Sequence, residues 1–213
     1  MTITTATAGS EGAILYPDFS SSAAGNSLVL KATSSQFTSI FAPVEGSFTV
    51  VKALNTPTLT LNIDSSTIAC KAAEIWSSPA IFATISNNLK NAISDSAVTF
   101  KFETGVTGAV VSISNTYMQC YSANKGAIYQ LPAGIPLTET SSTFKQNAAL
   151  QSVIYCNGCS ATFTSSTFID SLASDGSILT MENAASVTFT SVKMNHGKAF
   201  NFGGAIYAFG TGI

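Results

Sequence analysis

Apolar and hydroxyl-bearing residues alternate along this chain, and one spacing within the pattern recurs over most of its length. Six pairs of mostly apolar anchor residues stand seven positions apart, and in five of the six a Ser or Thr lies two positions before the second member. The second members are 31, 50, 26, 24 and 26 residues apart. A period near 25 fits if the longest interval is either two turns or one turn with an insertion. The six pairs are Leu30/Phe37, Leu61/Ile68, Val111/Met118, Leu137/Phe144, Ala161/Phe168 and Val187/Met194.

Repeats of this length cannot bury a core alone and must stack on one another. Between the anchors lie period-two runs such as 59–63, 98–102 and 187–190, which are typical of short strands with one buried face. A small pair before apolar residues recurs as Gly12-Ala13, Gly46-Ser47, Gly126-Ala127, Gly176-Ser177 and Gly204-Ala205. We read the glycine as a tight corner in left-handed backbone space and the small neighbour as a close backbone approach. The sequence therefore predicts an all-β fold, a right-handed parallel β-helix solenoid of about 25 residues per turn.

One stretch breaks the repeat. Ile81, Ile85, Leu89 and Ile93 fall four apart, which is helical spacing and predicts a short helical insertion near residues 82–95. The alternative is an irregular turn with a long loop. Neither end of the chain carries a recognisable cap, so we expect residues 1–213 to be a single β-helix domain that is a segment of a longer chain or a filament protomer.

The low charge content of the chain limits the classes of partner that it is expected to bind. Only 9% of the residues are charged, the net charge is −2, and the cations are nine lysines without any arginine. Such a chain offers no basic stripe, so nucleic acid is not an expected partner. No run approaches 18 continuous apolar residues, so membrane insertion is not expected either, and no signal peptide is visible. The chain has no N-x-S/T sequon, so we expect any glycans on Ser or Thr.

The four cysteines are the disulfide candidates. Cys156 and Cys159 form a CxxC with an Asn-Gly centre, which favours a tight turn and a local disulfide. Cys70 and Cys120 each follow an anchor by two residues, and they become neighbours about 5 Å apart if the long interval is one turn with an insertion. Free buried thiols, a metal site and redox use remain open. A zinc site would need a second CxxC, and redox catalysis would need a βαβ context, and the sequence shows neither.

Few residues in the sequence suggest catalysis. The only histidine, His196, lies one repeat after Asp170 at the equivalent step, an arrangement more typical of a surface hydrogen bond than of a catalytic dyad. We expect no catalytic residue, metal site or cofactor. Trp76 and five tyrosines are candidates for a sugar-stacking strip, but we expect Tyr129, Tyr155 and Tyr207, which share a repeat position, to form a structural ladder. The other two tyrosines are Tyr117 and Tyr121.

Three phrases carry a resemblance: Ile-Tyr-Cys-Asn-Gly-Cys at 154–159, Ser-Ser-Thr-Phe at 165–168 and Gly-Gly-Ala-Ile-Tyr at 203–207. They resemble the pectin-lyase-like β-helix repeats of large extracellular proteins, among them ciliate surface proteins and polymorphic outer-membrane autotransporters. The Asn-Asn-x-Ala phrase common in those repeats is reduced here to 145–148 and 169–172. The resemblance implies an extracellular or cell-surface location, but this fold hosts enzymes, adhesins and plain fibres.

We therefore expect a non-enzymatic extracellular scaffold, a β-helical segment of a surface protein or fibre. Its expected partners are copies of itself associated end to end or further repeats of the same chain. The alternative is a carbohydrate-binding or polysaccharide-processing β-helix protein, which would need a carboxylate cluster that the scattered aspartates do not obviously supply.

Overall fold

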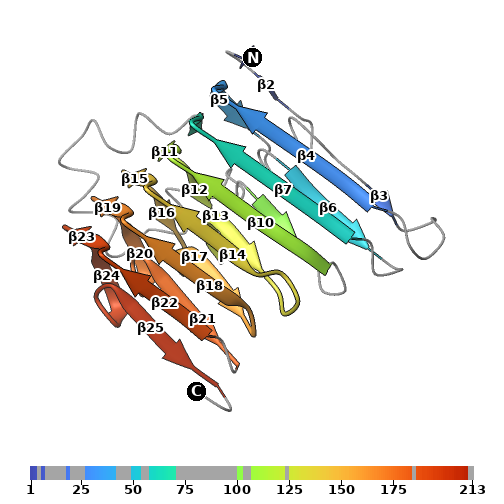
Figure 1. Cartoon of the computed structure of the whole chain (residues 1–213). Coiled ribbons are helices and arrows are strands. Elements are labelled where there is room, and N and C mark those ends of the chain that lie inside the picture. The colour runs from blue at the N-terminus through green and yellow to red at the C-terminus, as the bar shows by residue number, and fades with distance from the viewer. Residues whose placement is uncertain are drawn as a thin grey trace.

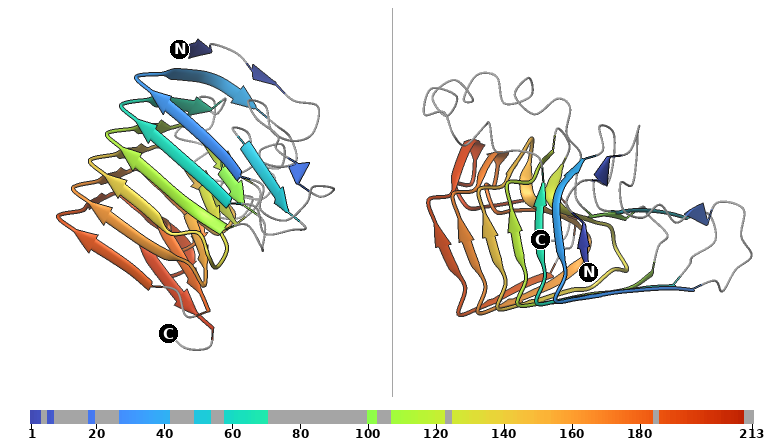
Figure 2. Two further views of the ribbon diagram at one scale, coloured as in Figure 1. Left: turned by 45° about the vertical axis from the view of Figure 1, so that its right-hand side comes forward. Right: turned by 90° about the horizontal axis from the view of Figure 1, so that it is seen from above.

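The structure is a computed structural model that describes residues 1–3, 6–7, 18–19, 27–41, 49–53, 58–70, 100–102, 107–122, 125–183 and 186–210. Its strands stack turn upon turn into a parallel β-solenoid (Figure 1). The stack is also evident from the side and from above (Figure 2). Every strand pair in the described ranges is parallel and joins one turn to the next, and no helix occurs there. The predicted all-β parallel solenoid is confirmed.

Four sheets make up the walls, and we number them in the order in which a turn visits them. Sheet 1 contains β4 (Ser27–Thr33), β7 (Thr58–Asp64), β10 (Thr107–Ile113), β14 (Leu137–Thr140), β18 (Ser160–Thr164) and β22 (Ser186–Thr190). Sheet 2 contains β1 (Thr2–Ile3), β2 (Ala6–Thr7), β5 (Gln36–Phe41), β8 (Thr67–Cys70), β11 (Thr116–Met118), β15 (Thr143–Lys145), β19 (Thr167–Ile169) and β23 (Lys193–Asn195).

The other two walls complete each turn. Sheet 3 contains β12 (Tyr121–Ser122), β16 (Ala148–Ala149), β20 (Leu172–Asp175) and β24 (Lys198–Phe202). Sheet 4 contains β3 (Asp18–Phe19), β6 (Thr49–Ala53), β9 (Phe100–Phe102), β13 (Gly126–Leu131), β17 (Ser152–Asn157), β21 (Leu179–Glu182) and β25 (Ile206–Phe209).

The long interval in the repeat is one turn with an insertion. Strand β8 pairs directly with β11, and Thr67 lies opposite Thr116. The same two turns are joined through β7 and β10 and through β6 and β9. The predicted helical insertion near 82–95 lies outside the described residues, as do the Gly12 and Gly46 motifs.

The third anchor pair was predicted one residue too late. Ile68 lies opposite Tyr117, and Tyr117 lies opposite Phe144. In sheet 1, Val110 and not Val111 pairs with Leu137. The pair is therefore Val110/Tyr117, still seven apart, and successive anchors from Tyr117 to Met194 are 27, 24 and 26 residues apart. Because side chains alternate along a strand, the slip exchanges the inner and outer faces for that turn.

The core is a column of anchors with a hydroxyl column beside it. The Tyr117 and Phe144 rings stack at 4.9 Å between centroids, and the Phe144 and Phe168 rings at 4.4 Å. Two residues before each of four anchors in the corrected register lies a buried Ser or Asn whose side-chain oxygen accepts a backbone N–H from the preceding turn. The members are Ser66, Asn115, Ser142 and Ser166, with donor–acceptor distances of 3.1, 2.7, 3.2 and 3.3 Å.

Corners use left-handed backbone. The residue before each member of the hydroxyl column has positive φ, as at Ser141 (φ 56°) and Ser165 (φ 52°). At the glycine corners, Gly176 has φ 54° and a Cβ there would lie 2.7 Å from the Tyr207 nitrogen. In the last turn the residue that needs this conformation is Gly203 (φ 51°), whereas Gly204, to which the motif assigned it, has open space around it.

The predicted ladder of Tyr129, Tyr155 and Tyr207 is wrong for Tyr129, whereas Tyr155 and Tyr207 share one column of sheet 4 with Thr180 between them. A bulge between Gly126 and Tyr129 shifts the register, so that Tyr129 pairs with Ile154 and points into the core. Tyr155 belongs to the neighbouring outward column, with Gln130 before it and Thr180 after it. Trp76 lies outside the described residues.

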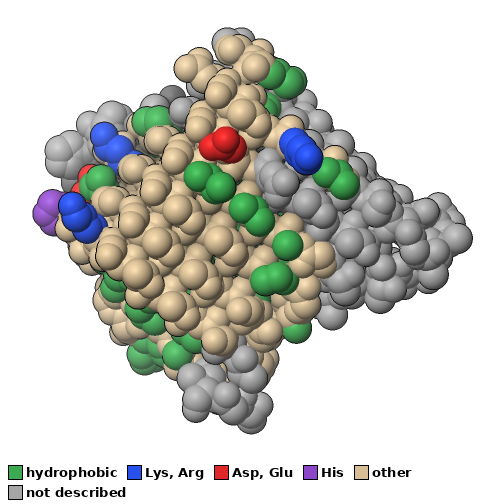
Figure 3. All heavy atoms as spheres, in the orientation of Figure 1, with side chains coloured by type: hydrophobic (Ala, Val, Ile, Leu, Met, Phe, Trp, Pro, Cys, Tyr) green, Lys and Arg blue, Asp and Glu red, His purple; other side chains and the backbone are tan. Residues whose placement is uncertain are grey.

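The outer surface is polar but scarcely charged. Figure 3 shows a face of mostly uncharged polar side chains and backbone with few acidic or basic groups. On sheet 1, Thr138, Thr162 and Thr188 lie one above another in register. Among the described residues, no helix is long and apolar enough to cross a membrane.

Candidate functional site

A shallow groove lies on the outside of sheet 4. Its volume is about 400 Å³, and its polar lining is Lys101 from β9, Gln130 from β13, Tyr155 and Asn157 from β17, and Lys125 just before β13. These side chains lie close together because of the strand register: Lys101, Gln130 and Tyr155 stand in one outward column across three successive turns. The walls therefore present amide and ammonium groups to solvent, while the Tyr155 side chain is almost fully covered.

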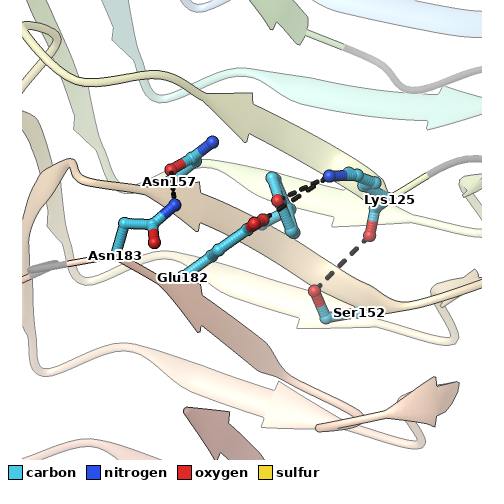
Figure 4. A network of polar contacts seen from close by, with 6 residues as sticks. Lys125, Ser152, Asn157, Glu182 and Asn183 are labelled. Atoms are coloured by element: carbon cyan, nitrogen blue, oxygen red, sulfur yellow. Dashed lines mark hydrogen bonds and ion pairs between the residues drawn. The ribbon is translucent and has the colours of Figure 1, made fainter. Parts of the chain in front are cut away.

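Lys125 is the best-connected residue of this groove. Its Nζ donates a hydrogen bond to the Tyr155 hydroxyl at 2.7 Å, lies 4.4 Å from the centre of the same ring, and is 3.5 Å from Glu182 Oε2. In Figure 4, Lys125 and Glu182 point toward each other across the sheet, with Asn157 and Asn183 joined beside them. Because Lys125 is half exposed, its ion pair with Glu182 is screened by water. The cluster can bind a polar ligand, but it presents no free nucleophile beside a base.

A second polar cluster lies inside the solenoid, where no solvent reaches it. Ser112 from β10 donates to Glu139 Oε2 at 2.6 Å, and Tyr129 from β13 donates to Glu139 Oε1 at 2.7 Å. Tyr117 from β11 closes the circuit, with its hydroxyl 2.8 Å from both the Tyr129 hydroxyl and Ser112 Oγ. We call these four side chains the Glu139 ring, and all four have 0% exposure.

Burial dominates the electrostatics of the Glu139 ring. Desolvation raises the pKa of Glu139 from 4.5 to about 7, although its hydrogen bonds from Ser112 and Tyr129 act in the opposite direction. Desolvation and the nearby Glu139 carboxyl raise the pKa of Tyr117 and of Tyr129 well above 10. Both tyrosines are therefore neutral hydroxyls at any physiological pH.

The sequence did not lead us to Glu139, but a signal for it exists. Glu139 lies two residues after the anchor Leu137, at the position that Phe163 holds after Ala161 in the next turn. An acidic residue at an inward repeat position is the mark of a buried ionisable group. Its partners Ser112 and Tyr117 were hidden because the predicted register placed them on the wrong face.

Cysteine pairing follows the CxxC prediction. Cys156 and Cys159 are disulfide-bonded and buried, with their Cα atoms 5.3 Å apart across the Asn-Gly turn. Cys120 is buried and disulfide-bonded as well. Strand β8, which ends at Cys70, pairs with β11, and Cys120 follows β11 by two residues. The Cys70 and Cys120 backbones therefore lie in adjacent turns, as expected if the long interval is one turn with an insertion. The Cys70 side chain lies outside the described part of the structure.

Asp170 and His196 meet as the repeat predicts. His196 Nδ1 is 3.3 Å from Asp170 Oδ1, and both residues have φ 54° at a corner of the stack. The imidazole is 84% exposed, so this is a solvated surface contact with no pocket around it. Within the described ranges, no three His, Cys, Asp or Glu side chains gather in a way that could hold a metal ion.

No protein-family model, no curated protein and no solved structure matches this chain. The fold class of the protein is therefore known from its structure alone: it is a parallel β-solenoid. Its function has to be argued from its own surfaces, because this fold supports many activities.

Proposed function

We propose that this chain is a non-enzymatic structural segment of an extracellular or cell-surface protein, and that it associates end to end through the open edge of its last turn. Among the described strands, β22, β23, β24 and β25 are each the final member of their sheet. Unpaired strand edges are templates for the addition of another strand. This open edge is the observation that carries the proposal.

The side chains of the last turn support a docking role for this edge. Phe202 is 58% exposed and Ile206 is 39% exposed, although Leu179, which holds the position of Ile206 in the preceding turn, is fully buried. Phe189 and Met194 extend the buried columns of Phe163 and Phe168 but are only partly covered. A further turn seated on this edge would bury Phe189, Met194 and Ile206 as their counterparts Phe163, Phe168 and Leu179 are buried in the preceding turn.

The other end of the stack offers a matching edge. Among the described strands, β4 is the last of sheet 1 at that end, so β22 of one copy can continue the sheet against β4 of the next. Such a contact joins two different surfaces and propagates into a filament instead of closing into a dimer. With 9% charged residues, little repulsion opposes it.

The extracellular part of the proposal is supported by the disulfide between Cys156 and Cys159, because disulfides persist in oxidising compartments. The hydroxyl-rich faces, such as the column of Thr138, Thr162 and Thr188, are available to water or to O-linked glycans. The assignment to the pectin-lyase-like surface type rests on the sequence resemblance alone.

Sedimentation of residues 1–213 over a range of concentrations, with electron microscopy, tests the association. We expect assemblies that grow with concentration and elongate along one axis. Phe202→Lys places a charge on the open edge and should shift the distribution to monomer. Thr138→Lys, which adds the same charge at an exposed site in the middle of the stack, should leave the assemblies unchanged. A concentration-independent monomer for the unaltered chain would overturn the proposal.

The groove on sheet 4 favours a second candidate, carbohydrate binding. Its amide and ammonium groups suit the hydroxyls of a saccharide. A glycan array probed with the unaltered chain and with Gln130→Ala and Asn157→Ala would decide this. Binding that both variants lose supports the candidate, and an absence of binding removes it. Turnover of any bound glycan would refute the non-enzymatic proposal.

A further inference from the structure

The Glu139 ring contains four oxygen-to-oxygen contacts, each short enough to need a proton between its two atoms. They run from Ser112 to Glu139, from Glu139 to Tyr129, from Tyr129 to Tyr117 and from Tyr117 back to Ser112, at 2.6, 2.7, 2.8 and 2.8 Å. A hydroxyl supplies one proton and a carboxylate supplies none. With Glu139 ionised, three protons serve four contacts, and one pair of oxygens is left with lone pairs facing each other.

A neutral Glu139 removes this deficit. The carboxyl proton is the fourth, so each of the four groups donates once and accepts once: one carboxyl oxygen accepts and the other donates, which reverses one of the two hydrogen bonds that an ionised Glu139 would accept from Ser112 and Tyr129. The remaining acceptor site of Ser112 is filled from outside the ring, because Asn115 Nδ2 donates to Ser112 Oγ at 2.8 Å and to the Ile63 carbonyl at 2.8 Å. Proton counting therefore favours the acid form independently of any electrostatic argument.

Among the residues that the structure describes, none that affects the ionisation of Glu139 carries a positive charge. Facing it are the phenols of Tyr117 from β11 and Tyr129 from β13 and the apolar ring of Phe163 from β18. The Ser112 hydroxyl from β10 and the Ser142 hydroxyl just before β15 also lie against it. The groups that influence its ionisation are hydroxyls, and no cation is among them. An isolated buried carboxylate costs several kcal/mol in desolvation, so such groups take up a proton.

We propose that the solenoid holds Glu139 as a neutral acid whose proton completes the ring, and that loss of this proton loosens the junction between the turns of β10 and β14. The ring is thus a pH-sensitive element built into the stack. It goes beyond the scaffold proposal and does not depend on it.

The direction of the pH effect follows from linkage. The pKa of Glu139 is raised by burial from 4.5 to about 7, so the folded protein binds a proton that the unfolded chain has lost over this range. The stabilisation is complete below pH 4.5 and is lost as the pH rises toward 7. A difference of this size corresponds to a change of about 300-fold in the unfolding equilibrium constant.

Denaturant unfolding from pH 4.5 to pH 8 tests the proposal on the unaltered chain, Glu139→Gln and Glu182→Gln. The amide of Gln donates and accepts like the neutral acid, so Glu139→Gln should lose the pH-dependent fall, which is about 150-fold between pH 4.5 and pH 8, and be more stable than the unaltered chain at pH 8. Glu182→Gln removes an acid from the outer surface and should keep the fall. If both variants keep it, the proposal is overturned.

Infrared spectroscopy of the unaltered chain provides a second test that does not depend on a variant folding. At pH 6 exposed carboxyl groups are ionised, so we expect one protonated carboxyl band in the native protein, which disappears when urea unfolds it at the same pH. Absence of that band from the native protein at pH 6 would overturn the proposal, whatever the behaviour of Glu139→Gln.

Discussion

Phe168→Ala should be among the most destabilising single changes in this chain. The Phe168 side chain is 0% exposed, stacks on Phe144 at 4.4 Å with planes 10° apart, and meets Phe163 edge-on at 5.8 Å. Truncating a buried Phe to Ala costs about 3–5 kcal/mol. Loss of two aromatic contacts, each worth about 0.5–1.5 kcal/mol, places the expected loss in the upper half of that range.

Urea unfolding followed by circular dichroism measures this loss as a change in the free energy of unfolding. Phe202→Ala is the matched control, because Phe202 also stacks on a ring, Tyr207 at 5.3 Å, but is 58% exposed. Its expected loss is about 1 kcal/mol or less. If Phe168→Ala lost no more than Phe202→Ala, Phe168 would not lie in a packed column and the register of sheet 2 would be wrong.

Three further predictions test the corners and the disulfide. A thiol reagent should label neither Cys156 nor Cys159 in the unfolded, unreduced chain, and quantitative labelling of both would contradict the disulfide and the extracellular proposal. Ser166→Ala removes the oxygen that accepts a buried backbone N–H and should lower the free energy of unfolding by about 1–2 kcal/mol, measured in urea. Gly176→Ala should lower the melting temperature clearly and Gly204→Ala should not, because only the former has left-handed backbone and a crowded Cβ position; equal shifts would refute this account of the corners.

The hydrophobic period was sufficient to predict the stack but not its register in every turn. Met118 and Thr116 satisfied the anchor pattern, so the pattern selected them although Tyr117 is the buried residue. The reason is physical: Tyr117 is amphipathic, and it points inward because the interior offers its hydroxyl two partners. The hydroxyl column in that turn is also continued by Asn115 and not by Ser or Thr, which removed the second clue.

The candidate sites depend on features that a repeat pattern does not encode. The bulge after Gly126 turns Tyr129 into the core and separates it from Tyr155, and no residue spacing announces that shift. Lys125 and Glu182 come together although one turn, that of β17, lies between them, because their long side chains reach across it on the outside of sheet 4. The contact of Asp170 with His196 was predictable, because both sit at one step of consecutive regular turns.

The Glu139 ring also explains how the turn of β10 and β11, which the hydrophobic pattern left ambiguous, acquires a unique register. One inward column of sheet 1 runs Ala32, Ile63, Ser112, Glu139, Phe163 and Phe189, so a polar pair replaces two apolar layers at the junction of β10 and β14. Apolar layers tolerate sliding, whereas hydrogen bonds have fixed directions and unpaired buried oxygens are costly. A slip of one residue in the turn of β10 and β11 would bury Glu139 without its partners. The polar ring therefore penalises the alternative register that the hydrophobic pattern leaves open, at the place in the chain where that pattern is weakest.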